Sequence, residues 1–303
     1  MKYSILILSI ISLSFIVSCN RTDGVDPAPG QNGTGKLKYI AAEPANGGIR
    51  FEYDDQQRVS LIIVGTLSNI DSFYVYYSAG NIANRLMLRY HGTLKSKTPI
   101  FLLRNGSGNV TSVVFKYAVD STDSFGNPNS LYQDENNAYY TTYTAGVDPV
   151  SRLINFEYNS KNRFTKFKLS NTTTEITYAP GDTIPNGAKH YFIDGTGATI
   201  VDANITYDTV SVSNINPAYE LMKQVPIINI YGRSFLPRTG YAEDVASSFL
   251  YYAPYLPDAV SYRRVSGLQV NEHYKYDFNT QGKMSAITNR AIGAALIYPF
   301  TYY

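Results

Sequence analysis

The stretch Ile49-Arg50-Phe51-Glu52-Tyr53-Asp54-Asp55-Gln56-Gln57-Arg58-Val59 alternates apolar and polar residues, passes through a polar turn and returns to apolar residues. A period of two is typical of a strand with one buried face, and two such runs across a short polar turn predict a β-hairpin. Two further segments align with the first without gaps. They are Ile154-Asn155-Phe156-Glu157-Tyr158-Asn159-Ser160-Lys161-Asn162-Arg163-Phe164 and Tyr274-Lys275-Tyr276-Asp277-Phe278-Asn279-Thr280-Gln281-Gly282-Lys283-Met284. We therefore expect hairpin repeats at 49–64, 154–169 and 274–289.

The turns and return strands of these hairpins predict a left-handed turn residue and a β-bulge. Gly282 stands where a three-residue turn often needs a positive φ; Asn162 tolerates that conformation, and Gln57 does so less well. After each turn the apolar residues stand three positions apart. The pairs are Val59 and Ile62, Phe164 and Phe167, and Met284 and Ile287. A step of three breaks the period of two, so we expect a β-bulge in each return strand.

Each hairpin also has an acidic residue followed six positions later by a basic one. The pairs are Glu52 and Arg58, Glu157 and Arg163, and Asp277 and Lys283. In a hairpin this spacing places the two charges diagonally on the polar face, where a pair contributes about 0.2–1 kcal/mol. The favoured role is to hold strand register on a solvated face rather than to form an active site.

The composition and the remaining segments predict an all-β fold. The chain has 28 Tyr and 14 Phe but no Trp, and Tyr and Phe favour pleated, half-buried surfaces. We expect further strands at 72–77, 85–90, 100–103, 110–119, 175–178, 205–212, 248–252 and 296–302, with long loops at 120–137 and 178–190. Asn216-Pro217 is a good helix start, so residues 217–224 are expected to form the one short helix. The expected architecture is a large antiparallel meander sheet, or a barrel-like or sandwich fold, built from repeated hairpins; a two-lobed sheet sharing one core is the alternative.

The N-terminus resembles the signal peptide of bacterial lipoproteins. Met1-Lys2 is followed by an apolar run from Ile5 to Val17, broken only by serines, and then by Cys19, the chain's only cysteine. The run is too short for a transmembrane helix, which needs about 20 residues. The resemblance implies that residues 1–18 are a signal peptide and that Cys19 is lipidated; Asn20, which is not acidic, favours the outer membrane by the same resemblance. Residues 19–36 read as the lipidated cysteine and a flexible tether spanning on the order of 20–25 Å, and residues 37–303 as one all-β domain.

The hairpins themselves are similar to the Tyr-Asp repeats of Rhs-type proteins, and more closely to hairpins in a group of Bacteroidetes lipoproteins of unknown function. That resemblance implies an extended antiparallel sheet or a barrel-like fold. It covers the three hairpins and the general layout, and it departs from the pattern where aspartate becomes Asn159 and Asn279 and where glycine is kept only at Gly282. Rhs shells need many closely spaced repeats, so a closed shell of that type is not expected.

No motif for catalysis, metal or cofactor binding stands out. His91, His190 and His273 have no second histidine or cysteine at metal-ligand spacing. Two acidic loop segments offer weaker alternatives: Asp120 and Asp123 with Asn127 for calcium, and Asp134-Glu135 as half of a glycosidase carboxyl pair. We therefore expect no catalytic, cofactor or metal residues, and Cys19 is the one predicted site residue.

These observations favour a membrane-anchored envelope lipoprotein, non-enzymatic, with a binding or assembly role on the periplasmic or the cell-surface face of the outer membrane. The expected partners are the membrane, through the lipid, and a protein or glycan ligand; the net charge of +2 indicates no nucleic acid. The alternative is a surface glycan-binding lipoprotein for nutrient capture, because tyrosines can stack on sugars, although the lack of Trp counts against it. A hydrolase with dispersed carboxylates stays open, and an integral barrel is disfavoured because its strands should show an apolar lipid face.

Overall fold

A computed structural model describes residues 36–41, 48–66, 69–79, 81–90, 96–123, 125–169, 172–181, 184–226, 254–264, 267, 269–291 and 294–303. The predicted signal peptide, Cys19 and the tether up to residue 35 lie outside the described residues, as do His91 and the strand expected at 248–252.

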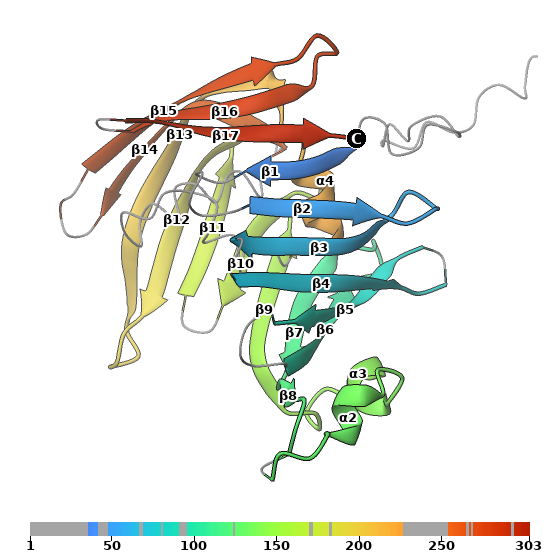
Figure 1. The fold of residues 1–303 in the computed structure, drawn as a ribbon. Helices are drawn as coiled ribbons and strands as arrows, with labels where there is room; N and C mark the ends of the chain where they lie inside the picture. The colour runs from blue at the N-terminus through green and yellow to red at the C-terminus, as the bar shows by residue number, and fades with distance from the viewer. Residues whose placement is uncertain are drawn as a thin grey trace, which may run out of the picture.

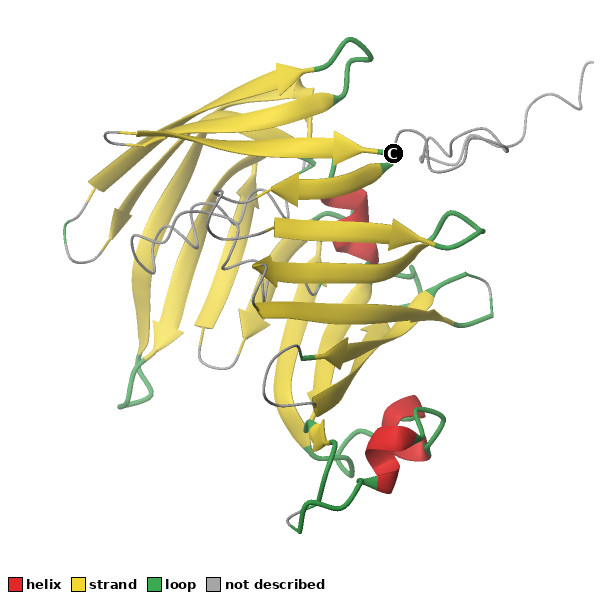
Figure 2. Ribbon diagram, viewed as in Figure 1, coloured by secondary structure: helices red, strands yellow, loops and turns green. Residues whose placement is uncertain are grey.

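The described residues form one antiparallel sheet of seventeen strands (Figure 1, Figure 2). The strands up to the middle of the chain are β1 Leu37–Ala41, β2 Gly48–Tyr53, β3 Val59–Thr66, β4 Asn69–Tyr77, β5 Ala83–Arg89, β6 Ser96–Arg104, β7 Val110–Lys116 and β8 Val119–Asp120. The others are β9 Val150–Tyr158, β10 Phe164–Leu169, β11 Thr172–Tyr178, β12 Pro185–Ile193, β13 Thr199–Ile215, β14 Tyr255–Arg264, β15 Gln269–Phe278, β16 Met284–Ala291 and β17 Ala294–Tyr302. The loop expected at 178–190 is shorter in the structure, because β12 begins at Pro185.

The sheet closes on itself. Strands pair with their neighbours in sequence, and β1 pairs with β17, so that Ile40 lies opposite Phe300. The two-residue strand β8 pairs with β6, while β7 pairs directly with β9. Leaving β8 aside, the other sixteen of the seventeen strands form a closed antiparallel barrel. This confirms the all-β, barrel-like prediction, and closure removes the two open edges that a flat meander would expose.

A single apolar cluster fills the inside of the barrel. Phe51 on β2, Phe73 on β4, Ile154 on β9 and Val260 on β14 all belong to it and are almost completely buried. Side chains from opposite walls can meet only in the interior, so these positions face inward. The exposed positions between them on the outer wall carry charges, among them Arg50, Glu157, Lys168, Lys189, Arg263 and Lys275. A barrel that spans a membrane has the reverse polarity, with an apolar band outside.

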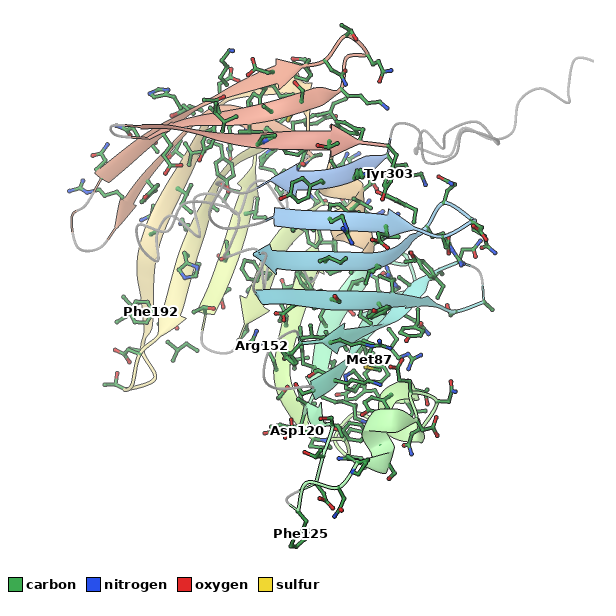
Figure 3. The ribbon with its side chains drawn as sticks, in the orientation of Figure 1. Met87, Asp120, Phe125, Arg152, Phe192 and Tyr303 are labelled. Atoms are coloured by element: carbon green, nitrogen blue, oxygen red, sulfur yellow. The ribbon has the colours of Figure 1, made fainter. Side chains whose placement is uncertain are left out.

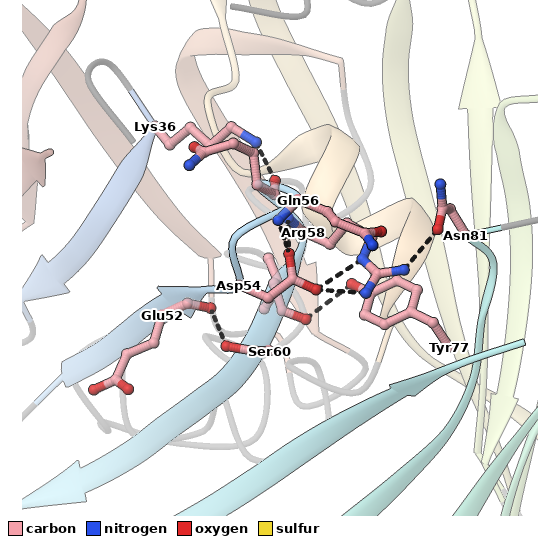
Figure 4. Close-up of polar contacts among 10 residues, drawn as sticks. Lys36, Glu52, Asp54, Gln56, Arg58, Ser60, Tyr77 and Asn81 are labelled. Atoms are coloured by element: carbon pink, nitrogen blue, oxygen red, sulfur yellow. Dashed lines mark hydrogen bonds and ion pairs between the residues drawn. The ribbon is translucent and has the colours of Figure 1, made fainter. Parts of the chain in front are cut away.

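The turns of the predicted hairpins share one hydrogen-bond pattern. In the turn between β2 and β3, Oδ1 of Asp54 accepts from the backbone N–H groups of Gln56 and Arg58 at 3.0 and 2.9 Å (Figure 4). Asn159 and Asn279 accept the corresponding pairs of bonds in the other two hairpins. The residue three positions after the acceptor has a positive φ in every case. The values are 62° at Gln57, 56° at Asn162 and 74° at Gly282, which confirms the predicted turn conformation.

The predicted bulges are confirmed as well. The register of each return strand shifts by one residue just after the turn, at Ser60, Thr165 and Ser285. The hydroxyl of Ser60 donates to the carbonyl of Glu52, and that of Ser285 donates to the carbonyl of Asp277. The bulge residue thus bonds back to the partner strand of its own hairpin.

A fourth copy of this unit lies between β6 and β7, where the sequence showed strands but no repeat. Oδ1 of Asn105 accepts from the N–H groups of Ser107 and Asn109 at 3.0 and 3.1 Å, and Gly108 has a φ of 79°. The register shifts again next to Val110. The repeat is therefore a unit of backbone geometry that the aligned residue types identify only in part.

Four tyrosine hydroxyls satisfy the carbonyls at which the bulges begin. Each tyrosine is the last residue of the strand that comes next around the barrel after the strand with the bulge. The bonds run from Tyr77 to Val59 at 2.8 Å, from Tyr158 to Val110 at 2.7 Å, from Tyr178 to Phe164 at 2.6 Å and from Tyr302 to Met284 at 2.8 Å. A bulge disrupts the ladder locally, so the hydroxyl supplies a partner for the displaced carbonyl. Burial raises the pKa of Tyr77 and of Tyr302 to about 12.

The predicted diagonal ion pairs are wrong. Glu52 pairs with Arg50 on its own strand at 2.8 Å, and Asp277 pairs with Lys275 at 2.6 Å. Arg58 instead pairs with Asp54 at 2.6 Å, and its guanidinium lies over the ring of Tyr77 at 4.3 Å. The basic residue follows the left-handed turn residue and precedes the bulge, so it points along the barrel end toward the next hairpin rather than across the polar face.

Three short helices appear among the described residues, against the expectation of at most one. They are α2 Ser130–Gln133, α3 Ala138–Thr141 and α4 Tyr219–Gln224. The first two lie within and just beyond the predicted loop 120–137; they have four residues each, too few for a periodic signal, and begin at the asparagine caps Asn129 and Asn137. The predicted helix is α4, which packs on the barrel core. In the described part of the chain no helix is both long and apolar enough to cross a membrane.

Candidate interaction site

Those of the residues considered from sequence that the structure describes do not assemble into a reactive centre. Cys19 and His91 lie outside the described residues. His190 on β12 has its Nδ1 at 3.0 Å from the hydroxyl of Thr174, and His273 is exposed on the outer wall of β15. In the part of the chain that the structure describes, no three His, Cys, Asp or Glu side chains form a group that could hold a metal ion.

The most distinctive surface is formed by residues 117–149, which connect β7 to β9 and are called the insertion below. It carries β8, α2 and α3 and lies at one end of the molecule (Figure 1). From Lys116 to Arg152 the sequence contains no intervening Lys or Arg, whereas it contains five acidic residues. These are Asp120, Asp123, Asp134, Glu135 and Asp148. The insertion is therefore an acidic segment attached to the barrel wall.

Glu135 fastens α2 to the outer wall of the barrel. Its carboxylate bonds to Lys97 on β6 at 2.6 Å, to Arg89 on β5, and to the hydroxyl of Tyr76 on β4 at 3.2 Å. Burial opposes ionisation of this group, but the hydrogen bond from Lys97 and the positive charges of Arg89 and Lys97 outweigh it and lower the pKa of Glu135. Three adjacent strands thus converge on one carboxylate.

A buried lysine makes the second attachment. The side chain of Lys116 at the end of β7 is 1% exposed, and its Nζ lies 3.0 Å from Asp148 and 3.3 Å from the carbonyl of Thr142. The ring of Tyr139 lies 4.3 Å from the same ammonium group. A buried charge is tolerated only when it is paired and hydrogen-bonded, so these contacts hold the return segment of the insertion in one place.

An apolar seat lies between these two attachments. Met87 on β5 faces outward and is fully buried, together with Tyr140 of α3 and Val119 of β8. Arg85 donates to the carbonyl of Tyr140 at 2.7 Å. Figure 3 places Met87 on the wall directly beside α2 and α3. The insertion is therefore packed against the barrel and not merely linked to it.

Phe125 projects from this fixed base. Its side chain is 87% exposed, the highest value among the large apolar residues described. Oδ1 of Asp123 accepts from the N–H groups of Phe125 and Asn127, at 2.9 Å each, and the Asn127 side-chain amide donates to Oδ2. Hydrogen bonds from Asn127, first of all, lower the pKa of Asp123. The tip of the loop is thus ordered by its own backbone, and it carries Phe125 away from the barrel (Figure 3).

The other ligand classes find less support. Among the tyrosine side chains whose exposure the structure describes, Tyr117 at 55% and Tyr303 at 39% are the exposed ones, and they come from opposite ends of the barrel. They do not make a row on which a sugar chain could stack. Glu135, the carboxyl considered for a glycosidase pair, is engaged by three barrel side chains, and Asp134 accepts from the N–H of Asn136.

The sequence predicts a loop for residues 120–137 of the insertion and a strand up to residue 119. The one signal that could have drawn attention to it is the run without a basic residue between Lys116 and Arg152. The barrel partners of Glu135 and Asp148 lie 32 to 59 residues earlier in the sequence, so no local pattern predicts those contacts.

Comparisons with known proteins give weak similarities. No protein-family model matches the chain, and no curated protein matches it. A porin-like protein from Bacteroides uniformis ATCC 8492 is similar in structure over 88% of this chain and 96% of that one, with 13% identity and a TM-score of 0.43. One from Bacteroides vulgatus ATCC 8482 is similar over 88% and 99%, with 11% identity and a TM-score of 0.37. The Tc holotoxin pore of Photorhabdus luminescens is similar over 86% of this chain and 12% of that one, with 10% identity and a TM-score of 0.23.

Proposed function

We propose that this chain is a non-enzymatic lipoprotein of the outer membrane, anchored through Cys19, and that its insertion binds a partner protein. The observation that carries the binding role is the exposed Phe125 on a loop fixed by Asp123. Aromatic side chains are the usual anchors of protein interfaces. A loop already held in one conformation loses less entropy when it binds.

The barrel itself serves as a scaffold in this proposal. Its interior is packed with apolar side chains and its outer wall carries charges, so it suits a domain that stands in water beside the membrane. The tether at 19–36 would provide the span between the lipid and the barrel. Glu135 and Asp148 are neutralised by barrel lysines and an arginine, but Asp120, Asp123 and Asp134 remain, and they favour a partner whose apolar pocket is bordered by basic residues.

Two experiments on cells test the proposal. The first determines location: intact cells are treated with protease and the barrel is detected, with Cys19→Ala as the localisation control. Loss of the wild-type signal would place the barrel on the cell surface, and protection until the outer membrane is opened would place it in the periplasm. A wild-type protein that fractionates like Cys19→Ala would contradict the lipid anchor.

The second experiment tests binding. Phe125 is replaced by the photoreactive residue p-benzoylphenylalanine in living cells, and Ile297, which is 55% exposed on the wall of β17, serves as the matched position. We expect a discrete cross-linked species from position 125 that position 297 does not give and that weakens when Asp123→Ala loosens the loop. Equal cross-linking from both positions, or a product insensitive to Asp123→Ala, would refute the binding role of the insertion. A cross-linked polysaccharide would move the function to the glycan-binding alternative.

A further inference from the structure

The end of the barrel opposite the insertion is called the rim below. It consists of the turns β2–β3, β4–β5, β6–β7, β9–β10 and β15–β16, the end of β13, helix α4 and the C-terminal Tyr303. Because strands alternate in direction and β7 and β9 meet the insertion at their other ends, the rim and the insertion lie at opposite ends. In Figure 3, Tyr303 and Phe125 mark these two ends.

Exposed apolar side chains gather at the rim. They come from five separate segments, so they surround the barrel end rather than forming one strand face. They are Ile82 at 44% exposed, Leu103 at 38%, Ile215 at 63%, Phe278 at 45% and Tyr303 at 39%. The insertion end also carries exposed apolar residues, among them Tyr117, Phe125 and Val147, so their number alone does not distinguish the rim. What distinguishes the rim is the charge that stands beside its apolar side chains.

Positive charge accompanies them. Among the described residues of the rim and of the strand ends that meet it, the basic ones are Lys36, Arg58, Arg104, Lys161, Arg163, Lys223 and Lys283, and the acidic ones are Asp54, Asp55, Glu220 and Asp277. Several of the basic groups contact neutral partners. Arg104 bonds to the carbonyls of Ala83, Gly108 and Gln224, Arg163 bonds to the hydroxyl of Tyr219, and Lys283 lies over the ring of Tyr302. Their charge is therefore not cancelled by these contacts, and the rim keeps an excess of positive charge.

The predicted tether joins the barrel at the same end. The carbonyl of Lys36 accepts a hydrogen bond from the N–H of Tyr303 at 3.0 Å, and Leu37 lies opposite Tyr302 at the start of β1. Nζ of Lys36 also lies over the ring of Tyr53 in the first hairpin (Figure 4 shows this lysine beside the β2–β3 turn). A lipid on Cys19 would on average lie on the order of 20–25 Å from the rim, the typical span of a flexible tether of this length, and the rim is the end of the barrel at which the tether begins.

We propose that the rim docks on the membrane surface, with its lysines and arginines against anionic lipid headgroups and its apolar side chains at the headgroup boundary. This inference rests on the proposed lipidation of Cys19. A basic patch near a lipid anchor adds an electrostatic attachment to anionic headgroups, which strengthens binding about fivefold for each Lys or Arg at the surface. Lys, Arg and Tyr side chains suit this boundary because their apolar parts can lie against the lipid chains while their polar tips remain among the headgroups and water. Docking of the rim directs the insertion and Phe125 away from the bilayer.

The test uses the complete lipidated protein reconstituted on vesicles. With Cys19 lipidated, one introduced cysteine is the chain's only free thiol, so Ile215→Cys and Phe278→Cys each place an environment-sensitive fluorophore on the rim. Val147→Cys, at a residue 78% exposed in the insertion, is the matched control. The vesicles contain phosphatidylcholine alone or phosphatidylcholine with phosphatidylglycerol. Circular dichroism checks that each variant keeps its strand content.

We expect the rim labels to shift to shorter wavelength and to be quenched by headgroup quenchers on the anionic vesicles, while the Val147→Cys label stays in water. Lys161→Gln and Lys283→Gln should each weaken this contact about fivefold. Rim labels that behave like the Val147→Cys label would overturn the docking while leaving the anchor in place. An equal shift on the uncharged vesicles would overturn the role of the rim's positive charge. If the protein floats with neither kind of vesicle, both the anchor and the docking are refuted.

Discussion

Removing the hydroxyl of Tyr77 tests whether the tyrosines at the barrel end stabilise the bulges. The hydroxyl donates to the carbonyl of Val59 at 2.8 Å, and the ring lies under Arg58 at 4.3 Å. Tyr77→Phe keeps the ring and its contact with the guanidinium and removes only the hydrogen bond. A hydrogen bond contributes about 0.5–1.5 kcal/mol net, and a carbonyl left without a partner adds to the cost. We expect the free energy of unfolding to fall by about 1–2 kcal/mol.

The assay is urea denaturation followed by circular dichroism, since the chain has no tryptophan. The matched control is Tyr74→Phe on the same strand, whose hydroxyl has no hydrogen bond among the described residues although its ring contacts Arg89 at 4.3 Å. It should change stability by less than about 0.5 kcal/mol. The two substitutions differ in one interaction, so equal effects would refute the proposed role of the hydroxyl, as would an unchanged midpoint in Tyr77→Phe.

The same reasoning extends to the other three tyrosines. Their sites lie on different strands around the barrel, and effects at separate sites usually add. Replacing all four residues with Phe should therefore cost about 4–8 kcal/mol, a large part of the roughly 5–15 kcal/mol that holds a typical domain together. The set consists of Tyr77, Tyr158, Tyr178 and Tyr302. A quadruple variant no less stable than Tyr77→Phe alone would show that the barrel end relaxes as one unit.

Three further predictions follow from the turns, the insertion and the tyrosine pKa values. Gln57→Gly should raise the free energy of unfolding by about 0.5–1 kcal/mol in urea denaturation, because Gln57 adopts a φ of 62° that glycine accepts without strain, and Gly282→Ala should lower it by about 1 kcal/mol. Glu135→Gln should make the insertion more sensitive to limited proteolysis at neutral pH, since it removes the charge that Arg89 and Lys97 bind. Burial raises the pKa of Tyr302 to about 12. Its protonated form therefore contributes stability that is complete below about pH 10 and is lost as the pH rises toward 12. Urea denaturation at a series of alkaline pH values measures this loss.

Each of these predictions has its own control. No atom lies within 4 Å of the position that a Cβ on Gly282 would occupy, so the cost of Gly282→Ala would report backbone strain and not a clash. For Glu135, the lowered pKa means that the wild-type contact persists above the ordinary pKa of 4.5 and is lost as the pH falls further, so acid should reproduce the effect of Glu135→Gln. An insertion that stays protected from protease in both conditions would contradict the role of Glu135 in fastening α2 to the barrel wall. For the alkaline loss, Tyr302→Phe should weaken the pH dependence, and an unchanged slope would contradict the assignment.

Local patterns in the sequence were sufficient wherever neighbouring residues decide the backbone. The alternation around Phe51 and Tyr53 predicted a hairpin, the step from Val59 to Ile62 predicted its bulge, and the turn chemistry predicted the positive φ at Gln57. These features depend on side-chain period and on backbone sterics within about ten residues. The copy at Asn105 was missed because Arg104 replaces the aromatic residue, although the same hydrogen bonds form.

Only the tertiary structure decided which distant segments meet. Closure of the barrel pairs Ile40 with Phe300, and a strand's own period does not identify its partner. The spacing in sequence predicted that Arg58 pairs with Glu52. In the folded barrel the turn and the bulge direct the Arg58 side chain toward Tyr77 instead, and Tyr77 lies on a different strand. The seat of the insertion likewise depends on Glu135 meeting strands far away in sequence. The sequence by itself thus determined the all-β class, the hairpin units and the lipoprotein-like N-terminus. The closure of the barrel, its apolar interior and its two different ends arise from long-range packing, which local periodicity does not encode.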